Sequence, residues 1–392
     1  MKIAILTSGI MPVPAVQGGA VETLVDFYLA YNDQHHLHDI TVYSVWHPAV
    51  EKQGALRSSV NHYHYVKIDG WWAKLRKRLY QATHGEEYYH YTIEYFLERA
   101  LSHLRRQHYD LVILENRPGY ALKVSRATRS PLVYHLHNDF LNRDSRHAAE
   151  LYELAARIIT VSDFIADRVR TVAPHDTKCM TVHNGIDTRA FSPKVAPVSL
   201  EAVNEGDFVV VFSGRINSEK GIMQLIAAMS LVARNRAVKL LVMGSSFYAN
   251  ASNDNPFAQR LREMADPIRD RIIFTGFIPY ADMPRYLRLA DVAVLPSVWD
   301  EPFGLTMVEA QAMGLPLVTT RRGGIPEVVT PESAILLDTD EHFVDRLAAA
   351  IIDLYDHPEK RRLMGQAAIA SSERFNNLRY AENFFKAIGS VR

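Results

Sequence analysis

The sequence predicts an α/β protein with two domains, each built around a parallel β-sheet. Its 392 residues exceed the roughly 250–300 at which single hydrophobic cores stop growing. Short β-branched runs alternate with stretches of helical periodicity, which is typical of parallel strands joined by crossover helices. This series is interrupted by a proline-containing segment at about 188–206 and begins again at Phe208. We therefore expect a first domain at 1–190 and a second domain at 191–372.

The individual elements follow from short apolar runs and from the turn residues between them. A strand at Lys2–Ser8 leads through a glycine- and proline-containing turn into a helix that Ala20 opens. Further strands of the first domain are expected at Ile40–Val45, Leu111–Leu114, Leu132–Leu136, Ile158–Val161 and Met180–Val182. Those of the second domain are expected at Phe208–Phe212, Val238–Met243, Ile272–Thr275, Val292–Leu295, Leu317–Thr319 and Ile335–Leu337. Its helices are expected near Met223–Ala233, Phe257–Ala265, Thr306–Met313 and Phe343–Tyr355.

Composition and charge exclude several classes of protein. Lys plus Arg number 44 and Asp plus Glu also number 44, so no bulk positive field would attract nucleic acid, and we expect no such partner. Cys179 is the single cysteine, which excludes an internal disulfide framework and a thiolate zinc cluster. The first apolar run is too short for a signal peptide, and no window approaches the roughly 20 apolar residues of a spanning helix. We expect a cytoplasmic protein whose membrane contact, if any, is peripheral.

Two loops combine glycines or cations with the start of a helix. Gly18-Gly19 lies between the first strand and its helix, where backbone N–H groups can approach an anion, although a plain loop explains two glycines equally well. The dinucleotide fingerprint G-x-G-x-x-G is absent there, which disfavours a nicotinamide enzyme. In the second domain, Gly214, Arg215 and Lys220 follow the first strand. The two cations can converge on a diphosphate, or they can simply be solvated surface charges.

Two glutamates frame an apolar segment after the expected strand Val292–Leu295. Glu301 precedes a helix, beside its free backbone N–H groups, and Glu309 lies about two turns further along. They can serve different ends of one extended ligand. The alternative is a helix cap at Glu301 and a solvent-facing Glu309.

Histidines and aspartates raise the question of a metal. His135 and His137 lie on one side of the strand end at Leu132–Leu136, where residues face the ligand crevice of a parallel sheet. A metal pair lacks a third ligand of recognisable spacing, so a crevice-lining or a packing histidine remains the competing interpretation. Asp338-Thr339-Asp340 looks like a metal-binding Asp-x-Asp but leads into an amphipathic helix, which favours a capping turn. We expect no metal.

Together these motifs resemble a known family over nearly the whole chain. The motifs are Gly18-Gly19 with Glu22, His137, Gly214-Arg215 with Lys220-Gly221, Glu301-x7-Glu309 and Gly323-Gly324-Ile325-Pro326-Glu327. They are similar to those of the retaining, nucleotide-sugar-dependent glycosyltransferases of family 4. The resemblance implies a GT-B fold, in which two Rossmann-like domains face each other across a cleft and a final helix, here about 373–392, returns to the first domain. It also implies transfer with no cofactor and no metal.

The resemblance assigns a role to each motif. It implies that Arg215 and Lys220 hold the donor diphosphate, that Glu309 accepts hydrogen bonds from the ribose, and that Glu301 contacts the donor sugar. Cations at the phosphates and a carboxylate near the sugar suit an oxocarbenium-like transition state. The remaining donor contacts would come from Gly19 at the phosphate, His137 at the sugar, backbone amides of Phe303, Gly304 and Leu305, and Gly276, Phe277 and Ile278 at the base.

The expected activity is retaining transfer from a UDP-sugar or GDP-sugar to a saccharide or lipid-linked oligosaccharide in bacterial surface polysaccharide assembly. The acceptor would be bound by first-domain loops in the divergent stretch from about His47 to Tyr95. A soluble acceptor such as a sugar phosphate is the main alternative. A nucleotide-sugar epimerase of the same fold and a catalytically silent binding subunit are two others.

One basic segment suggests a membrane contact. Read as a helix, residues Trp71–Tyr80 place two tryptophans and two leucines largely on one side, with cations on the other. The residues concerned are Trp71, Trp72, Leu75 and Leu79, and Lys74, Arg76, Lys77 and Arg78. This pattern suits the surface of an anionic membrane on the inner face. The competing interpretation is a surface helix whose tryptophans pack on the first domain.

Overall fold

The computed structural model describes residues 1–53, 57–83, 88–244 and 256–391, which form two compact units. Unit 1 comprises Met1–Gly185 and Asn377–Arg392, and unit 2 comprises Ile186–Asn376. The C-terminal segment therefore belongs to unit 1, as expected of a returning helix, although it joins that unit at Asn377 rather than near residue 373.

The described residues of unit 1 form a seven-stranded parallel sheet of order β3-β2-β1-β4-β5-β6-β7. Its strands are β1 (Lys2–Leu6), β2 (Asp39–Val45), β3 (Asn61–Val66), β4 (Leu111–Glu115), β5 (Leu132–Leu136), β6 (Ala155–Thr160) and β7 (Cys179–Thr181). The chain starts in the middle and winds outward in both directions, so β1 and β4 are neighbours that lead to opposite halves of the sheet. Ligands of such sheets bind beyond the carboxyl ends of these strands, at the switch point.

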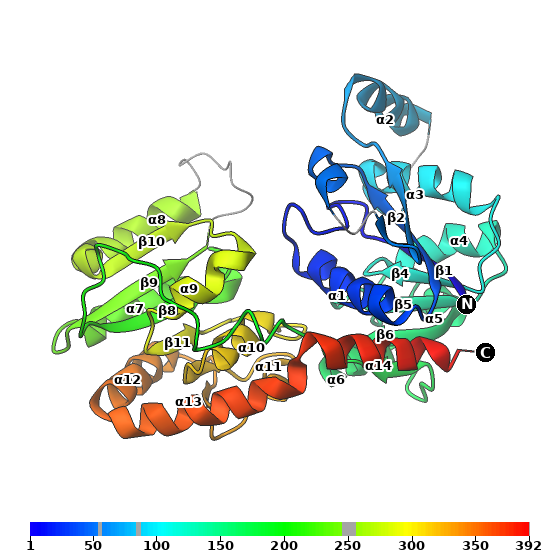
Figure 1. Cartoon of the computed structure of the whole chain (residues 1–392). Coiled ribbons are helices and arrows are strands. Elements are labelled where there is room, and N and C mark those ends of the chain that lie inside the picture. Colours follow the sequence, from blue (N-terminus) through cyan, green and yellow to red (C-terminus); the bar gives the residue numbers. More distant parts are fainter. Residues whose placement is uncertain (54–56, 84–87, 245–255, 392) are drawn as a thin grey trace. The chain divides into compact units, whose positions relative to one another are not determined.

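Helices complete unit 1, and the last of them closes its core. They are α1 (Ala20–His35), α2 (Trp71–Thr83), α3 (Tyr91–Leu104), α4 (Ala121–Ala127), α5 (Ala148–Leu154), α6 (Asp163–Arg170) and α14 (Asn377–Gly389). Figure 1 shows α14, in red, alongside α1, in blue. Phe384 of α14 stacks on Tyr28 of α1 with ring centroids 4.1 Å apart, and both side chains are fully buried. The packing of two buried aromatic rings holds the C-terminal helix on unit 1.

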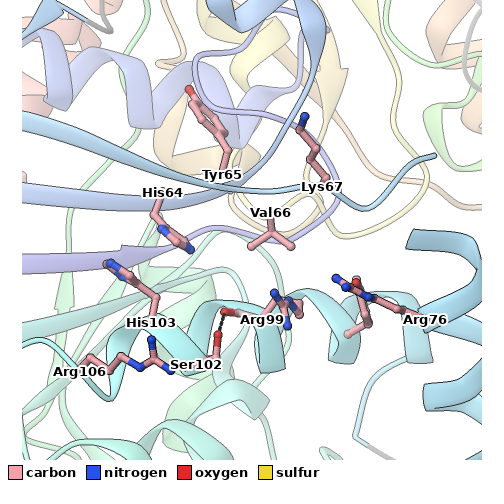
Figure 2. Close-up of a pocket in the computed structure, with 10 residues that line it drawn as sticks. His64, Tyr65, Val66, Lys67, Arg76, Arg99, Ser102, His103 and Arg106 are labelled. Carbon is pink, nitrogen blue, oxygen red and sulfur yellow. Dashed lines mark hydrogen bonds between the residues drawn. The ribbon is translucent and has the colours of Figure 1, made fainter. Parts of the chain in front are cut away.

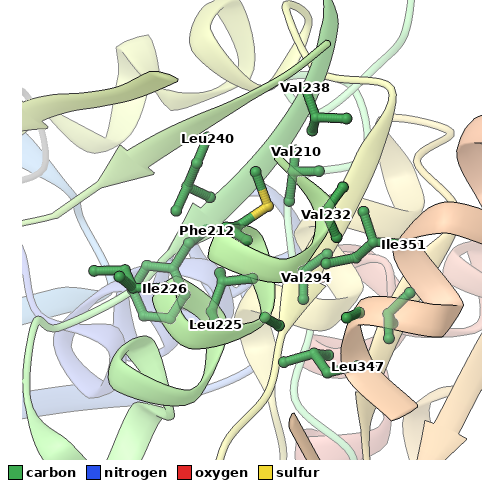
Figure 3. Packing of buried hydrophobic residues seen from close by; sticks show 14 of the residues in the cluster. Val210, Phe212, Leu225, Ile226, Val232, Val238, Leu240, Val294, Leu347 and Ile351 are labelled. Atoms are coloured by element: carbon green, nitrogen blue, oxygen red, sulfur yellow. The ribbon is translucent and has the colours of Figure 1, made fainter. Parts of the chain in front are cut away.

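Unit 2 repeats this architecture with a six-stranded parallel sheet of order β10-β9-β8-β11-β12-β13 in its described residues. Its strands are β8 (Phe208–Ser213), β9 (Val238–Met243), β10 (Ile272–Gly276), β11 (Val292–Leu295), β12 (Leu317–Thr320) and β13 (Ala334–Leu337). The helices are α7 (Ile222–Val232), α8 (Pro256–Ala265), α9 (Met283–Leu287), α10 (Leu305–Ala312), α11 (Ile325–Val328), α12 (Phe343–Asp356) and α13 (Pro358–Ser372). Figure 3 shows α7 and α12 packed on the strands through Leu225, Ile226, Leu347 and Ile351.

The stretch from about His47 to Tyr95, which was expected to supply acceptor loops, contains a strand that was not expected, while Trp71–Tyr80 is helical as predicted. It contains the edge strand β3, which pairs in parallel with β2 from Ile40↔Asn61 to Val45↔Val66, and the helix α2. The sequence of β3, Asn-His-Tyr-His-Tyr-Val, is polar because an edge strand has one partner and an exposed flank, so it lacks the apolar run by which the other strands are detected.

The exposure of the tryptophans in α2 contradicts one of their two interpretations and leaves membrane contact as a prediction. Trp71 and Trp72 are 68% and 65% exposed, so they do not pack on unit 1. Leu75 and Leu79 are exposed as well. The interpretation as an ordinary packed surface helix is therefore wrong. Of the helices in the described part of the chain, none combines the length and hydropathy that crossing a bilayer requires.

Candidate active site

In unit 2, the loops that carry the predicted donor residues follow β8 and β11. These strands are neighbours at the switch point of the sheet, so the loop after Ser213 and the loop after Leu295 emerge side by side. Backbone and side-chain bonds join the two loops, because Val298 N–H and Ser297 Oγ both donate to the carbonyl of Glu219, at 2.8 Å and 3.2 Å. Arg215 and Lys220 are thereby held on the same edge of the sheet as Glu301.

Lys220 and Glu301, which are 81 residues apart in sequence, form an ion pair between Lys220 Nζ and Glu301 Oε1. The Glu301 side chain is 8% exposed and that of Lys220 is 20% exposed, so solvent screens the pair only weakly. Lys220 Nζ also lies 5.7 Å from the centroid of the Trp299 ring. The structure thus brings together a cation predicted for a diphosphate and a carboxylate predicted for the sugar attached to it.

The backbone around Glu301 explains the glycine pair that follows β12. Gly324 N–H donates to the Glu301 carbonyl at 2.7 Å. Gly323 has φ of 56°, and a Cβ atom there would collide with the Glu301 backbone. A side chain at this position would therefore displace the loop that carries the carboxylate.

The segment Phe303-Gly304-Leu305 forms the start of α10. Phe303 is buried and packs edge-on against Phe375, with ring centroids 5.6 Å apart. Gly304 is the N-cap with φ of 106°, and Leu305 is the first helical residue. The first N–H groups of a helix lack intrahelical acceptors and carry partial positive charge, so they can bind the oxygens of an anionic ligand.

Glu309 lies in α10, is 4% exposed, and is bonded by the hydroxyl of Tyr280. Burial raises the pKa of Glu309 to about 8, although the bond from Tyr280 opposes this shift. Tyr280 follows the predicted base-binding segment, in which Gly276 ends β10 and Ile278 is buried. Tyr280 was not predicted as a site residue, since nothing in the sequence relates it to Glu309.

In unit 1, Gly18 and Gly19 lie between β1 and α1, as predicted. Gly19 has φ of 106°, and a Cβ atom there would overlap the carboxylate of Glu22. Ser8, which follows β1, donates its hydroxyl to Glu22 at 3.2 Å. Burial raises the pKa of Glu22. The glycine turn is therefore packed around a buried acid of the next helix.

His137 belongs to a buried cluster that we call the Glu115 cluster, made of Glu115, His135 and His137. The three residues follow or end β4 and β5, which are adjacent in the sheet. Glu115 Oε1 lies 3.1 Å from His135 Nδ1, and Oε2 lies 3.1 Å from His137 Nε2. The Tyr28 hydroxyl donates to Glu115 Oε1 at 2.8 Å. Sequence reasoning missed Glu115, although its position at the carboxyl end of the strand next to β5 was the available signal.

Charge is unevenly distributed in the Glu115 cluster. Burial opposes ionisation of Glu115, but the two histidines hold its pKa well below the ordinary value. Burial and the neighbouring His135 lower the pKa of His137 to about 4. A neutral His137 that donates Nε2–H to Glu115 keeps the lone pair on Nδ1, which has no hydrogen-bond partner among the described residues.

The Glu115 cluster also supplies the third ligand that the histidine pair lacks in sequence. One possible ligand atom from each of the three residues lies within 4.8 Å of the others. Both carboxylate oxygens are hydrogen-bonded to the imidazoles. The same geometry therefore fits either a metal site or a hydrogen-bonded network without a metal. By contrast, Asp338 and Asp340 are exposed, and Asp340 accepts from Arg346 and from the His342 N–H in a turn before α12.

Two doubly wound parallel sheets are the architecture of the GT-B fold, and comparison with known proteins identifies the family. Residues 18–190 match the family described as Glycosyltransferase Family 4, and residues 200–371 match Glycosyl transferases group 1. The chain therefore belongs to the family 4 and group 1 glycosyltransferases.

Individual relatives cover the chain to different extents. Spore coat protein SA of Bacillus subtilis is 28% identical over 98% of this chain and 98% of its own length. D-inositol 3-phosphate glycosyltransferase of Segniliparus rotundus is 32% identical over 56% of this chain and 50% of its own length. The structure of Anabaena HepE in complex with UDP and glucose has a TM-score of 0.73 at 21% identity, with 100% of both chains covered. The predicted GT-B fold is thus confirmed.

Proposed function

We propose that this glycosyltransferase moves a hexose from a UDP-sugar, with retention of configuration, to a saccharide or lipid-linked oligosaccharide acceptor. The ion pair between Lys220 and Glu301 is the observation that carries the proposal. A diphosphate linked to a sugar presents a negative group next to a reacting carbon, and this pair places a cation and a carboxylate side by side. Support for UDP as the nucleotide comes from HepE, whose structure contains UDP and glucose. A GDP-sugar remains the alternative donor.

The proposed reaction proceeds on one face of the sugar. The bond between the anomeric carbon and the diphosphate oxygen breaks, the acceptor oxygen attacks from the same side, and the departing phosphate takes the acceptor proton. Arg215 and Lys220 stabilise the charge that grows on the phosphate, and Glu301 stabilises the positive charge on the sugar. Double displacement through a covalent intermediate is the competing route.

The setting that we propose is surface polysaccharide assembly at the cytoplasmic face of a membrane. The exposed Trp71 and Trp72 and the cations of α2 suit contact with anionic lipid, where a lipid-linked acceptor would be found. The second candidate acceptor is a soluble sugar phosphate. The relative named D-inositol 3-phosphate glycosyltransferase favours this candidate.

Measurement of UDP release and of product from UDP-sugars tests the proposal. Thermal-shift screening against UDP-, GDP- and ADP-sugars first identifies the donor, since a ligand of the native state raises its stability. Release of UDP with formation of a glycoside supports transfer. Isomerised donor without release of nucleotide would identify an epimerase, and binding without any turnover would identify a silent subunit.

We expect Lys220→Ala or Arg215→Ala to reduce donor turnover by roughly 10- to 100-fold, because each charge-assisted contact contributes about 1.5–3 kcal/mol. Arg215 is exposed on a loop, so its replacement should change the free energy of unfolding little, whereas Lys220→Ala leaves the 8% exposed Glu301 carboxylate without its cation and should lower that free energy as well. Steady-state kinetics together with urea denaturation separates the two effects. Normal turnover in the double variant would remove the diphosphate assignment.

We also expect UDP binding to release a proton near pH 7. Unliganded Glu309 is largely protonated below its pKa of about 8. Ribose hydroxyls that donate to Glu309 would stabilise the charged form and lower this pKa. UDP affinity should therefore rise as the pH increases toward 8 and level off above it. Calorimetry in buffers of different ionisation enthalpy measures the proton, and Glu309→Gln should abolish its release.

Activity should persist in excess chelator, because Arg215 and Lys220 supply the positive charge that a divalent ion provides in other transferases. The measurement is turnover in EDTA, followed by addition of Mg²⁺, Mn²⁺ or Zn²⁺. Loss of activity that one of these ions restores would instead assign a metal, with the Glu115 cluster as a candidate site.

A further inference from the structure

Unit 1 contains a basic pocket of about 350 Å³ beside its edge strand β3. Figure 2 shows how β3, α2 and α3 contribute its walls, with His64 and His103 turned toward each other. The permanently charged side chains that line it are Lys67, Arg76, Arg99 and Arg106. No carboxylate is found among the described residues of its lining. We call this site the basic pocket.

α3 and the turn after it supply three side chains to the basic pocket. Arg99 and His103 are spaced i and i+4 on α3, and Arg106 lies in the turn that follows its last residue, Leu104. Arg99 and Arg106 thus bring two positive charges to this wall of the pocket. Two acids of α3 do not neutralise these charges, because Glu94 and Glu98 pair with Lys123 at 3.0 Å and 3.1 Å.

Aromatic and hydroxyl contacts, rather than acids, position the two histidines and Lys67 of the pocket. His64 stacks on His103 with centroids 4.1 Å apart, and the Tyr43 hydroxyl lies 3.0 Å from His103 Nδ1. Lys67 Nζ lies 4.5 Å from the centroid of Trp46. Burial, with the nearby His103 and Arg99, lowers the pKa of His64, as expected in a positive environment. Within the described ranges, no ion pair joins Lys67, Arg76, Arg99 or Arg106 to a carboxylate.

We propose that the basic pocket binds the phosphate group of a ligand. Arginine side chains from two helices present planar donor groups that match phosphate oxygens, and a bound phosphate would relieve their mutual repulsion. The volume of the pocket suits a phosphate with part of the group that it esterifies. We further propose that this phosphate is part of the acceptor. That second step rests on the proposed function.

Two kinds of ligand could supply the phosphate, because both carry a phosphate group. One is a soluble sugar phosphate. The other is the headgroup of an anionic lipid, because α2 contributes Arg76 to the pocket and exposes Trp71 and Trp72.

Calorimetric titration of inorganic pyrophosphate into the full chain at low ionic strength tests the site. The titration is run without UDP and again with saturating UDP, which occupies the diphosphate site proposed in unit 2. We expect the double variant Arg99→Gln/Arg106→Gln to raise the Kd at least about tenfold. The matched control is Arg105→Gln/Arg129→Gln, which removes two exposed charges that do not line the pocket and should leave the Kd unchanged. An unchanged Kd in the pocket variant, or an equal loss in the control, would overturn the proposal.

Two further titrations identify the source of the phosphate. The first probe is glucose 1-phosphate, and the second is a phosphatidylcholine vesicle with or without phosphatidylglycerol. If the ligand is a sugar phosphate, glucose 1-phosphate binds and only the pocket variant loses it. If the ligand is a lipid headgroup, binding to anionic vesicles falls both in the pocket variant and in Trp71→Ser/Trp72→Ser. If neither probe depends on the pocket arginines, the phosphate assignment is wrong.

The experiment separates failure of the pocket from failure of the proposed function. UDP binding is measured first in the wild type and in the pocket variant, and the binding that the pocket variant retains reports on unit 2. In one outcome, the wild type binds pyrophosphate but not UDP, while the pocket variant binds neither. That result would support the basic pocket and reject the proposed donor.

Discussion

Replacement of Glu301 by glutamine should lower kcat by about 10²–10³-fold and change KM for the donor much less. The side chain is 8% exposed and paired with Lys220, so its charge acts in a weakly screened environment. Glutamine preserves the size and one acceptor oxygen, and therefore the loop and the contact with Lys220 can persist. What is lost is the negative charge that stabilises a positive sugar in the transition state.

Glu301→Gln is compared with Glu309→Gln. Glu301 lies in the loop before α10, and Glu309 lies within α10. We expect the Glu309 change to appear mainly in donor affinity, because a ribose contact is equally strong in the ground and transition states. Single-turnover rates and binding of UDP distinguish the two. If both variants raise only KM and by similar factors, the division of roles between sugar and ribose is wrong.

The double-wound fold could be predicted because each central strand is an apolar run between turn residues. β1, β4, β8 and β11 are buried on both faces, and burial on both faces requires nearly continuous hydrophobic sequence. The edge strand β3 escaped prediction because its polar pattern reflects the environment of an edge.

The candidate site was predictable residue by residue but not as a set of contacts. Local sequence indicated that Lys220 and Glu301 each lie near a helix start. Their contact depends on β8 and β11 being neighbours, which is a property of topology and not of spacing. Glu115 and Tyr280 were missed for the same reason, since each meets its partner across strands or elements that are distant in sequence.

Replacement of Glu115 by alanine should lower the free energy of unfolding of unit 1 by about 3–5 kcal/mol, because buried donors that lose their acceptor cost about 1–3 kcal/mol each. The fully buried carboxylate is bonded by His135, His137 and the Tyr28 hydroxyl. Its loss leaves two imidazoles and a phenol without their acceptor. Glu115→Gln should cost less, because an amide oxygen can still accept one of these bonds. Urea denaturation of the full chain measures both changes.

The pH dependence of the same transition gives a second test of the Glu115 cluster. His137 has a folded-state pKa of about 4, below its ordinary value near 6.5, so the unfolded chain binds more protons between these values. The stability that neutral His137 contributes is therefore present above pH 6.5 and is lost as the pH falls toward 4, by on the order of 3 kcal/mol. His137→Gln should flatten the profile in this window. A wild-type profile that is flat between pH 6.5 and 4 would show that His137 is not held neutral, and that the lone pair on its Nδ1 is not reserved for a ligand.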